Sequence, residues 1–524
     1  MEQFDKMTDI LVIGAGGSGL PAALSAKQAG AEHVMVIDRR SITGGTGAII
    51  GHMFAVESPA QRRAGVHITN DEVYRRHMEC AHWACDARLA RDFINNSGRI
   101  AEWLETIPGI RFNHVSATSG THYLTSLSIT QDNIMPVTGR VITGSIAREC
   151  RRLGVEFLMG TRVRSLIKDG DRKVVGVCAT QKDSKLRIGA KAVIVATGSI
   201  TGNPELRKKF YPEANFEKTE ITASYPWVSG DGYLMTQEAG ALKDPLMTRL
   251  YIGPTVPRHM FMQMYLSRPY GYLLNKFGMR FVNEDLFVTN DDHSMLGSAV
   301  DRQPLHLCYG LMDSATLHTM VERQEVLNNF EGMFGQQVEE DFYEKAADVD
   351  PQKMVGKGAN NPCAWLDTLE ESLNKYASDG SGLVCRADTT DELAEFIGCD
   401  KDDLQAQIDR INENAANHYD AEFLKDPRWI YPVKTPPYYL VKSEPIFLDS
   451  IFGGIRVDNR MRVLHESNEP FEGLYAAGIG VSGFIGSHGL GALDGTAFGS
   501  SVYSGYTAGR QAAEYCRKVS ESSC

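Results

Sequence analysis

Residues 10–19, ILVIGAGGSG, join a short apolar run to a turn rich in glycine. The apolar residues 10–13 do not alternate with polar ones, which is typical of a parallel strand buried on both faces. Residues 20–28 have the apolar spacing of a helix, and residues 33–37 are a second apolar run that ends at Asp38. The order strand, glycine turn, helix, strand predicts an α/β domain built on a parallel sheet.

The glycine turn has the G-x-G-x-x-G spacing of a dinucleotide-binding site. Gly14 permits the tight turn, Gly16 lets the backbone approach a pyrophosphate, and Gly19 lets helix and strand pack closely. The amino end of the helix offers N–H groups and the positive end of its dipole to the phosphates. Asp38 stands where a carboxylate can accept the ribose hydroxyls. We therefore predict a Rossmann-like domain that binds a nucleotide, in preference to a glycine turn without a ligand.

The composition of the chain argues against several classes of partner and site. The 524 residues are 43% hydrophobic and 23% charged, as in ordinary globular proteins, and the net charge is -12 without a basic stretch. We therefore expect no nucleic-acid partner. The ten cysteines show no CxxC or Cys/His zinc spacing, so we expect no metal site, reduced thiols and a cytoplasmic location. Residues 10–26 and 473–493 are apolar but broken by glycine, so we expect no membrane span.

The same style of sequence returns later in the chain. Residues 155–158, 162–166 and 191–195 are strand-like runs. Residues 473–478 form another strand and turn, and residues 495–517 have the small-residue spacing of a tightly packed helix. The nucleotide-binding domain is therefore expected to resume after excursions rather than to end with its first two strands.

The middle of the chain has a different character. Residues 260–265 are rich in Met and aromatic side chains, and acidic helical segments such as residues 390–415 follow. Such a block between two glycine-rich ends predicts an inserted domain. The predicted organisation is a nucleotide-binding domain in two parts, residues 1–236 and 431–524, with an inserted domain at residues 237–430.

Seven short segments follow one another along the chain: residues 14–19 (GAGGSG), 43–46 (TGGT), 196–198 (ATG), 230–232 (GDG), 278–284 (GMRFVNE), 452–454 (FGG) and 473–478 (GLYAAG). In sequence and order they resemble the flavoprotein subunit family of fumarate reductase and succinate dehydrogenase, with its 3-ketosteroid dehydrogenase and soluble ene-reductase branches. The resemblance covers nearly the full length. It implies a Rossmann-like FAD-binding domain interrupted by an inserted α+β capping domain, with the substrate held between cap and flavin.

The resemblance also implies the chemistry. It implies FAD and hydride transfer between flavin N5 and one carbon of an activated C=C or CH–CH unit, while a protein group handles the proton at the other carbon. The covalent branch has a His just before its glycine pair, whereas residues 40–43 are RSIT here, so we expect non-covalent FAD. The residues expected to bind FAD are Gly14, Gly16, Gly17, Ser18, Gly19, Asp38, Arg39, Gly44, Gly45, Thr46, Val163, Ala196, Thr197, Gly198, Asp231, Gly478, Gly491, Ala492 and Leu493.

Departures from the family pattern shape the substrate prediction. The fumarate-reducing branch has a proton-donating Arg in the segment that resembles residues 312–316, which contain none here. Its His–Arg carboxylate clamp is also missing, because Asp449-Ser450 precedes Phe452 and residues 486–491 hold no Asn-Arg pair. A dicarboxylate would be left with poorly paired charge. We therefore expect a mainly apolar or aromatic, steroid-like substrate with one activating carbonyl, an enone or an enoate.

Four residues are candidates for polarising the substrate or moving the proton. His488 lies in a glycine-rich loop expected to border the flavin, and its alternative is a structural hydrogen bond. Tyr123 lies where the ketosteroid branch carries a tyrosine, and its alternative is an ordinary interface aromatic. Glu284 is either a remnant of a proton relay or a salt-bridge partner in the cap. Arg258 is either a contact to a carboxylate or carbonyl or a solvated loop charge.

The leading functional prediction is an FAD-dependent oxidoreductase that reduces a conjugated C=C bond with electrons from a separate donor. One alternative is a 3-ketosteroid-type dehydrogenase that runs the reverse reaction toward a separate acceptor. Others are a fumarate reductase-like enzyme for a small unsaturated acid, and a flavin-binding electron-transfer subunit without catalysis of its own. Direction stays open, because the flavin potential depends on the charges around the ring.

Overall fold

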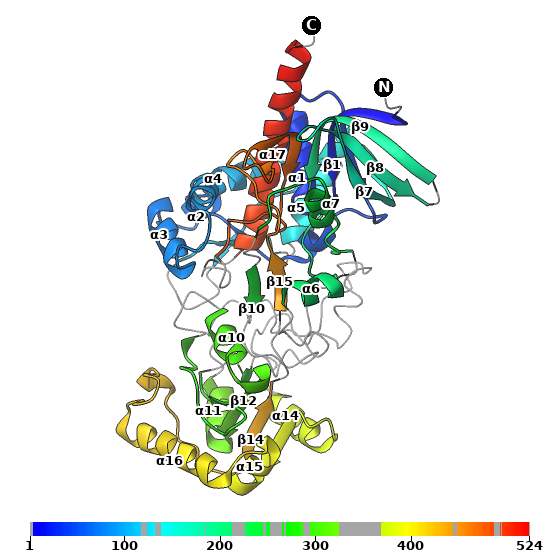
Figure 1. Ribbon diagram of the computed structural model, residues 1–524. Helices are drawn as coiled ribbons and strands as arrows, with labels where there is room; N and C mark the ends of the chain where they lie inside the picture. The colour runs from blue at the N-terminus through cyan, green and yellow to red at the C-terminus, as the bar shows by residue number, and fades with distance from the viewer. Residues whose placement is uncertain are drawn as a thin grey trace.

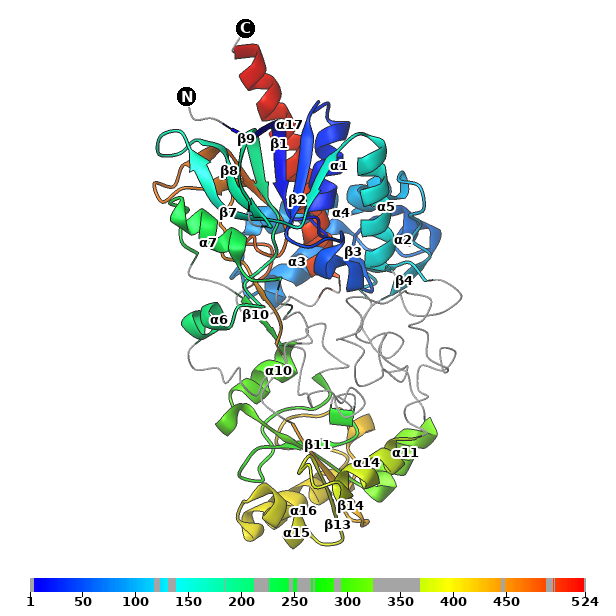
Figure 2. The ribbon, with the colours of Figure 1, turned by 90° about the vertical axis from the view of Figure 1, so that its right-hand side faces the viewer.

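The computed structural model describes residues 4–116, 123–130, 138–182, 184–211, 225, 227–244, 248–251, 265–266, 269–286, 294–323, 368–443, 448–486, 493 and 495–522. These residues form two regions, each built around its own sheet (Figures 1 and 2). The first region contains both ends of the chain, and the second lies at the opposite end of the molecule.

The sheet of the first region has the strand order β16-β17-β9-β1-β2-β6. Its strands are β1 (Lys6–Ile13), β2 (Val34–Asp38), β6 (Glu156–Met159), β9 (Ser184–Val195), β16 (Arg462–Leu464) and β17 (Pro470–Ala476), with β7 (Thr161–Lys168) and β8 (Val174–Gln181) extending from β9. The strands from β17 to β6 are parallel, with Ile10 opposite Val34 and Ile13 opposite Val195. This parallel sheet, in which residues 10–13 are all buried, confirms the predicted α/β architecture.

Two helices bring the ends of the chain together. α1 (Gly19–Gln28) packs against α17 (Thr496–Ser522), as Figures 1 and 2 show. A Cβ atom on Gly505 or Gly509 would overlap a backbone oxygen of α1 or of its N-cap, so only glycine permits this close approach. The small-residue helix predicted over residues 495–517 is therefore confirmed.

Shorter elements surround the sheet and lead toward the candidate site. They are η1 (Gly45–Ile49), β3 (Met53–Phe54), α2 (Pro59–Arg63), α3 (Asn70–Cys80), α4 (Ala87–Glu105), β4 (His114–Ser116), β5 (Ser126–Ser128), α5 (Thr138–Arg152), α6 (Pro204–Phe210) and α7 (Asp231–Glu238). Asp86 caps α4 by accepting the N–H groups of Arg88 and Leu89. These two hydrogen bonds fix the start of α4 and so the end of the segment that connects it to α3.

The second region is an antiparallel sheet with helices on both faces. Its strands, in the order β11-β12-β14-β13, are β11 (Tyr272–Leu274), β12 (Tyr309–Asp313), β14 (Tyr438–Lys442) and β13 (Val384–Ala387). Its helices are α10 (Ser294–Asp301), α11 (Ser314–Arg323), α14 (Leu369–Ser378), α15 (Thr390–Ile397) and α16 (Lys401–Asn417). Tyr439 and Val441 lie in a core with α10, α11 and α14, whereas Leu440 lies in a core with α15 and α16. The alternation follows from the two-residue period of a strand.

A two-stranded ribbon lies between the regions (Figure 1). It consists of β10 (Thr248–Tyr251) and β15 (Leu448–Phe452), which pair antiparallel. The predicted domain limit at residue 236 falls inside α7, and the limit at residue 430 precedes β14, which pairs with β12 and β13. An inserted domain that contained the whole of this sheet would therefore extend at least to residue 442.

In the part of the chain that the structure describes, no helix has both the length and the apolar character needed to cross a membrane. Eight cysteines are described, and none of these eight forms a disulfide.

Candidate functional site

The glycine turn lies at the carboxyl ends of β1, β2 and β9. Gly14 has a φ of +111° and donates its N–H to the carbonyl of Ile37 at 2.7 Å. A Cβ atom on Gly14 would overlap the carbonyl oxygen of Ala196, and one on Gly19 would overlap the carbonyl oxygen of Gly14. Close packing of strand, turn and helix therefore requires both glycines. Ser18, the N-cap of α1, makes no side-chain capping bond, so the amino end of the helix remains available to an anion.

A second glycine-rich segment, residues 44–47, lies against this turn. The N–H of Gly44 donates to the carbonyl of Ala15 at 2.8 Å, and Gly44 forms a parallel bridge with Gly16. The two segments together make a narrow backbone cradle. The structure thus brings together five residues predicted to bind FAD: Gly16, Gly17, Gly44, Gly45 and Thr46.

Asp38 ends β2 beside the turn. Its Oδ2 accepts the N–H of Ala15 at 2.7 Å, and its Oδ1 accepts the N–H of Arg40 at 2.8 Å. Burial raises the pKa of Asp38, while these backbone N–H groups and the charge of Arg40 oppose the rise. Each carboxylate oxygen keeps a second lone pair, so a ribose hydroxyl can still donate to it. The position suits the ribose-binding role that the sequence predicts.

Arg39 and Asp231, both predicted to bind FAD, meet in one ion cluster. Asp231, at the start of α7, accepts two hydrogen bonds from Arg162 at 2.9 and 2.6 Å. Arg39 lies 3.5 Å from Asp231 and donates to Ser229 at 2.7 Å. Desolvation acts to raise the pKa of Asp231, but hydrogen bonds from Arg162 and Ser229 hold that pKa below its usual value. Sequence reasoning selects Val163 and misses its neighbour Arg162, because an arginine on a strand gives no local sign of a partner 69 residues away.

The end of β9 completes this side of the cradle. Ala196 follows β9 and lies under the glycine turn, as the overlap with Gly14 shows. Thr197 accepts the N–H of Gly232 through Oγ1 at 3.1 Å, and Gly198 has a φ of +78°. Val163 is buried in β7, where it lies opposite Ala179 of β8.

Gly478 brings the C-terminal part of the chain onto the turn. It has a φ of +92° and donates its N–H to Ser504 Oγ at 2.9 Å. A Cβ atom on Gly478 would lie 2.5 Å from Ser18 Oγ, so a side chain has no room there. Leu493 is buried just before α17. Two further predicted cofactor residues, Gly491 and Ala492, lie outside the described residues.

A pocket opens beside this segment. It has an empty volume of about 300 Å³, open solvent included, and its walls come from Phe452, Gly453, Ser500 and most of residues 478–485. Ring and aliphatic side chains form part of the wall, and backbone from glycines forms much of the rest.

Ser482 ties three segments together at the edge of the pocket. Its Oγ accepts the N–H of Gly454 at 2.8 Å and donates to the carboxylate of Asp244. Asp244 follows α7, so this hydroxyl joins the chain after α7 to the segment after β15 and to the pocket wall. Sequence reasoning missed both Ser482 and Asp244, which carry no motif of their own.

Two of the four predicted catalytic residues, His488 and Arg258, lie outside the described residues. Tyr123 is half-buried and packs against the core of the first region, and its carbonyl accepts the N–H of Thr125 at 2.8 Å. Glu284 belongs to the second region. Tyr123 and Glu284 are therefore parts of different cores.

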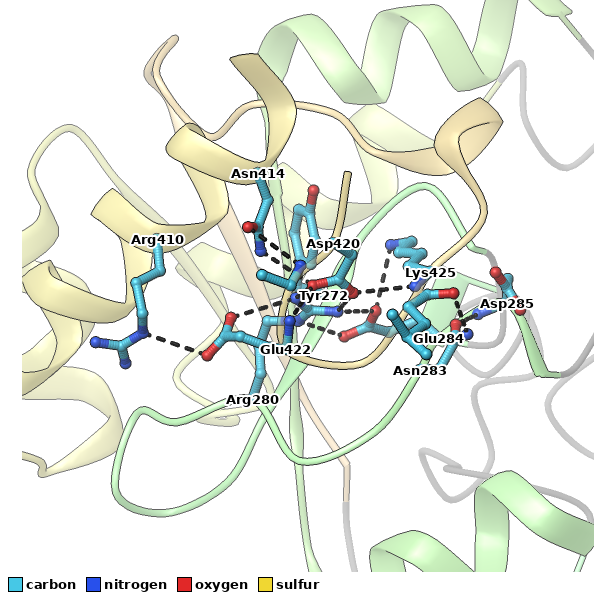
Figure 3. Close-up of polar contacts among 12 residues, drawn as sticks. Tyr272, Arg280, Asn283, Glu284, Asp285, Arg410, Asn414, Asp420, Glu422 and Lys425 are labelled. Carbon is cyan, nitrogen blue, oxygen red and sulfur yellow. Dashed lines mark hydrogen bonds and ion pairs between the residues drawn. The ribbon is translucent and has the colours of Figure 1, made fainter. Parts of the chain in front are cut away.

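Glu284 lies in a buried ion cluster (Figure 3). Arg280 donates to Glu284 at 3.1 and 2.9 Å and to Asp420 at 3.0 and 2.9 Å. Lys425 lies 3.4 Å from Glu284 and donates to the carbonyl of Gly271 at 2.6 Å. The side chains of these two cations and two carboxylates are at most 1% exposed, and the charge of the buried Asp285 also acts on Lys425.

Further contacts engage the same carboxylate. Glu284 Oε1 also accepts the N–H of Leu273 at 3.1 Å, and Lys425 lies 4.1 Å from the centre of the Tyr272 ring. Burial lowers the pKa of Lys425 to about 8, although the charge of Glu284 opposes this. Of the two alternatives that the sequence leaves for Glu284, the salt-bridge partner is the one seen in the described residues.

Comparison with known proteins identifies the family. The family model described as "FAD binding domain" matches residues 9–496. The chain belongs to this family. It is 26% identical over 525 residues to vinyl phenol reductase of Lactiplantibacillus plantarum, with 98% of this chain and 97% of that protein covered. It is 25% identical over 519 residues to NADH:fumarate oxidoreductase of Klebsiella pneumoniae, and there it spans 98% of itself but only 48% of the other protein.

A solved structure shows the same fold. The 3-ketosteroid-Δ4-(5α)-dehydrogenase of Rhodococcus jostii superposes with a TM-score of 0.70 at 20% identity, and 98% of each chain is covered. The predicted fumarate reductase and succinate dehydrogenase flavoprotein family is confirmed, and the protein is an oxidoreductase with FAD as its cofactor. The residues present fit FAD, because the cradle has glycines where Cβ atoms would clash, an acid at the end of β2 and the amino end of α1.

Proposed function

We propose that the protein reduces an activated C=C bond in a mainly apolar or aromatic enone or enoate, with electrons from a separate donor and in the cytoplasm. The supporting observation is a family match over nearly the whole chain, combined with a glycine cradle that fits FAD. When bound, FAD supplies the two-electron chemistry. Relatives named for vinyl phenol and fumarate support an unsaturated substrate.

The chain's own residues have binding roles in this proposal. The amino end of α1 and the backbone of the glycine turn hold the pyrophosphate, and Asp38 holds the ribose. The Arg39–Asp231–Arg162 cluster fixes the strand ends around them. The cofactor is non-covalent, since residues 40–43 offer no histidine.

We assign the second region the role of a capping domain. It lies between β10 and β15 in the chain and has its own two cores, so it can move as a unit over the pocket. Glu284 then serves the cohesion of this cap, and His488, Tyr123 and Arg258 remain the candidates for the substrate carbonyl and the proton.

The side chains around the pocket are compatible with an apolar substrate in this proposal. Phe452, Phe484 and Ile485 contribute to its wall, while its described polar side chains are Ser482 and Ser500. A carboxylate placed there would have no arginine among the described lining residues. Leaving such a charge poorly paired costs about 2–3 kcal/mol, or about 100-fold in rate.

Anaerobic stopped-flow spectroscopy tests the proposal. The FAD-loaded protein is reduced with dithionite and mixed with cinnamate, 4-vinylphenol, a steroid enone or fumarate, and reoxidation of the flavin is followed. We expect the most reactive aromatic or steroid alkene to act about 100-fold faster than fumarate. Faster reoxidation by fumarate would establish the small-acid alternative instead. Flavin reduction by the saturated steroid, without reoxidation by any alkene, would establish the dehydrogenase direction.

A further inference from the structure

Most of residues 478–485 line the pocket, and the backbone of the segment 478–486 is held by different partners along its length. In the first half, the chain after β15 supplies the donors: Gly453 N–H to Ile479 O at 2.8 Å and Ile455 N–H to Gly480 O at 3.0 Å. The second half, residues 483–486, instead lies against the end of α3 and the start of α4. That contact is made by a part of the chain about 400 residues away.

The imidazole of His77 is the side chain that holds this second half. His77 lies in α3, is 1% exposed and contacts the Phe484 carbonyl through Nε2 at 3.0 Å. A carbonyl only accepts, so Nε2 carries the proton and Nδ1 is a bare acceptor. Nδ1 has no partner among the described residues. Burial lowers the pKa of His77 to about 4, although the bond to Phe484 opposes this, so the ring stays neutral near pH 7.

A buried imidazole with one unsatisfied nitrogen is unfavourable for packing alone. A leucine or methionine would fill similar space and leave no polar atom unpaired. What the imidazole adds at this position is the Nε2–H donor that the Phe484 carbonyl receives. A histidine at position 77 is therefore explained by its hydrogen bond to the pocket wall rather than by packing within the core.

Close packing leaves the wall segment little freedom once this bond forms. A Cβ atom on Gly486 would lie 2.8 Å from the Ala81 Cβ, and one on Gly483 would lie 2.9 Å from the Asp86 Cβ. Ala81 is four residues after His77, so both face the segment from the same side of the helix. The Phe484 ring packs edge-on against the Phe93 ring of α4, with 6.0 Å between the ring centroids, which adds a side-chain contact to the same segment.

We propose that His77 is a positioning residue that fixes residues 483–486 and so shapes the pocket for the substrate. The proposal rests on the proposed function in one respect, that this pocket is part of the flavin and substrate site. His77 acts through Phe484, because its Nε2 contacts the backbone carbonyl of that residue.

Three variants of the full-length, FAD-loaded protein test the role. His77→Leu removes the donor, and His77→Gln keeps an amide N–H where Nε2 stands. His465→Leu is the matched control, because His465 is also a buried histidine with a side-chain hydrogen bond, to Ser467, but it lies beside β16. If His77→Leu does not fold, His77→Asn replaces it, since its shorter amide falls short of Phe484.

Hydrogen exchange, visible circular dichroism of the flavin and steady-state kinetics are measured on each variant. In His77→Leu we expect amides of residues 483–486 to exchange about 5-fold faster and the KM of the best alkene to rise about 5-fold, with kcat within about 2-fold. The flavin dichroism should change in His77→Leu and return in His77→Gln. The control should move none of these.

Wild-type exchange and dichroism in His77→Leu, or equal changes in the control, would overturn the positioning role. Equal changes in His77→Gln would also overturn it, because they would show that the ring shape and not the donor matters. If no alkene reoxidises the flavin in any form, the proposed function fails, and exchange and dichroism still decide the role of His77.

Discussion

Replacing Glu284 by glutamine should strongly destabilise the second region. The substitution keeps size and one acceptor but removes a charge that Arg280 contacts at 2.9 Å and Lys425 at 3.4 Å. Arg280 would then keep the buried carboxylate of Asp420, while Lys425 would lose its 3.4 Å carboxylate partner. Breaking one partner of a buried ion pair typically costs about 3–5 kcal/mol of unfolding free energy.

Urea unfolding of the FAD-loaded protein measures this loss. Far-UV circular dichroism and tryptophan fluorescence should be followed together, because coincident transitions are needed for a free-energy difference. Glu422→Gln is the control. Glu422 lies 3.4 Å from the same Arg280 but is 22% exposed, so we expect a loss of about 0–1 kcal/mol.

A double variant separates charge balance from shape. Adding Lys425→Met to Glu284→Gln removes one buried charge of each sign, and we expect it to recover at least about 1 kcal/mol relative to the sum of the single losses. If Glu284→Gln unfolds within about 1 kcal/mol of the parent while its kcat falls about 100-fold, the charge-balance reasoning is refuted and the proton-relay alternative is supported.

Three other outcomes follow from the described geometry. Gly19→Ala should purify with little FAD, measured as absorbance at 450 nm, because its Cβ would overlap the carbonyl oxygen of Gly14, whereas the open position Gly144 should accept alanine with no loss. Asp38→Ala should weaken FAD binding about 10-fold in a fluorescence titration, and an unchanged affinity would remove the ribose role. His77 has a folded pKa of about 4, below its ordinary 6.5, so it costs stability as pH falls from 6.5 toward 4; His77→Gln should flatten that fall by about 3 kcal/mol in urea titrations at each pH.

Local pattern explains what the sequence could predict. The unbroken apolar run 10–13 and the glycines after it report their own neighbourhood, since a buried parallel strand and a tight turn each restrict residue type within a few positions. Asp38 was predictable for the same reason, because it ends the next strand. The helix that begins at residue 496 was predictable from its small residues, which permit close packing.

Partners far apart in the chain could not be predicted in this way. Arg280 and Asp420 are 140 residues apart, and neither position carries a periodic signal that names the other. His77 and Phe484 are 407 residues apart, and the histidine sits in an ordinary amphipathic helix. Glu284 lay inside a family motif, yet the motif alone left its two alternatives equal, because burial and partners decide between them.

The two regions depend on different kinds of contact, close glycine packing in the first and buried ion pairs in the second. At the cofactor cradle, Gly478 packs against the Ser18 side chain and a Cβ atom on Gly505 would overlap the Ser18 carbonyl oxygen, so the C-terminal part of the chain closes the N-terminal turn. The buried ion cluster of the second region is formed within that region, because the carboxylate partners of Arg280 are Glu284, Asp420 and Glu422. A region that pairs its buried charges internally needs no charged partner from the two parts of the nucleotide site on either side of it in the chain. The contacts that hold the second region together are therefore separate from those that close the cradle, and the described contacts of Glu284 belong to the second region.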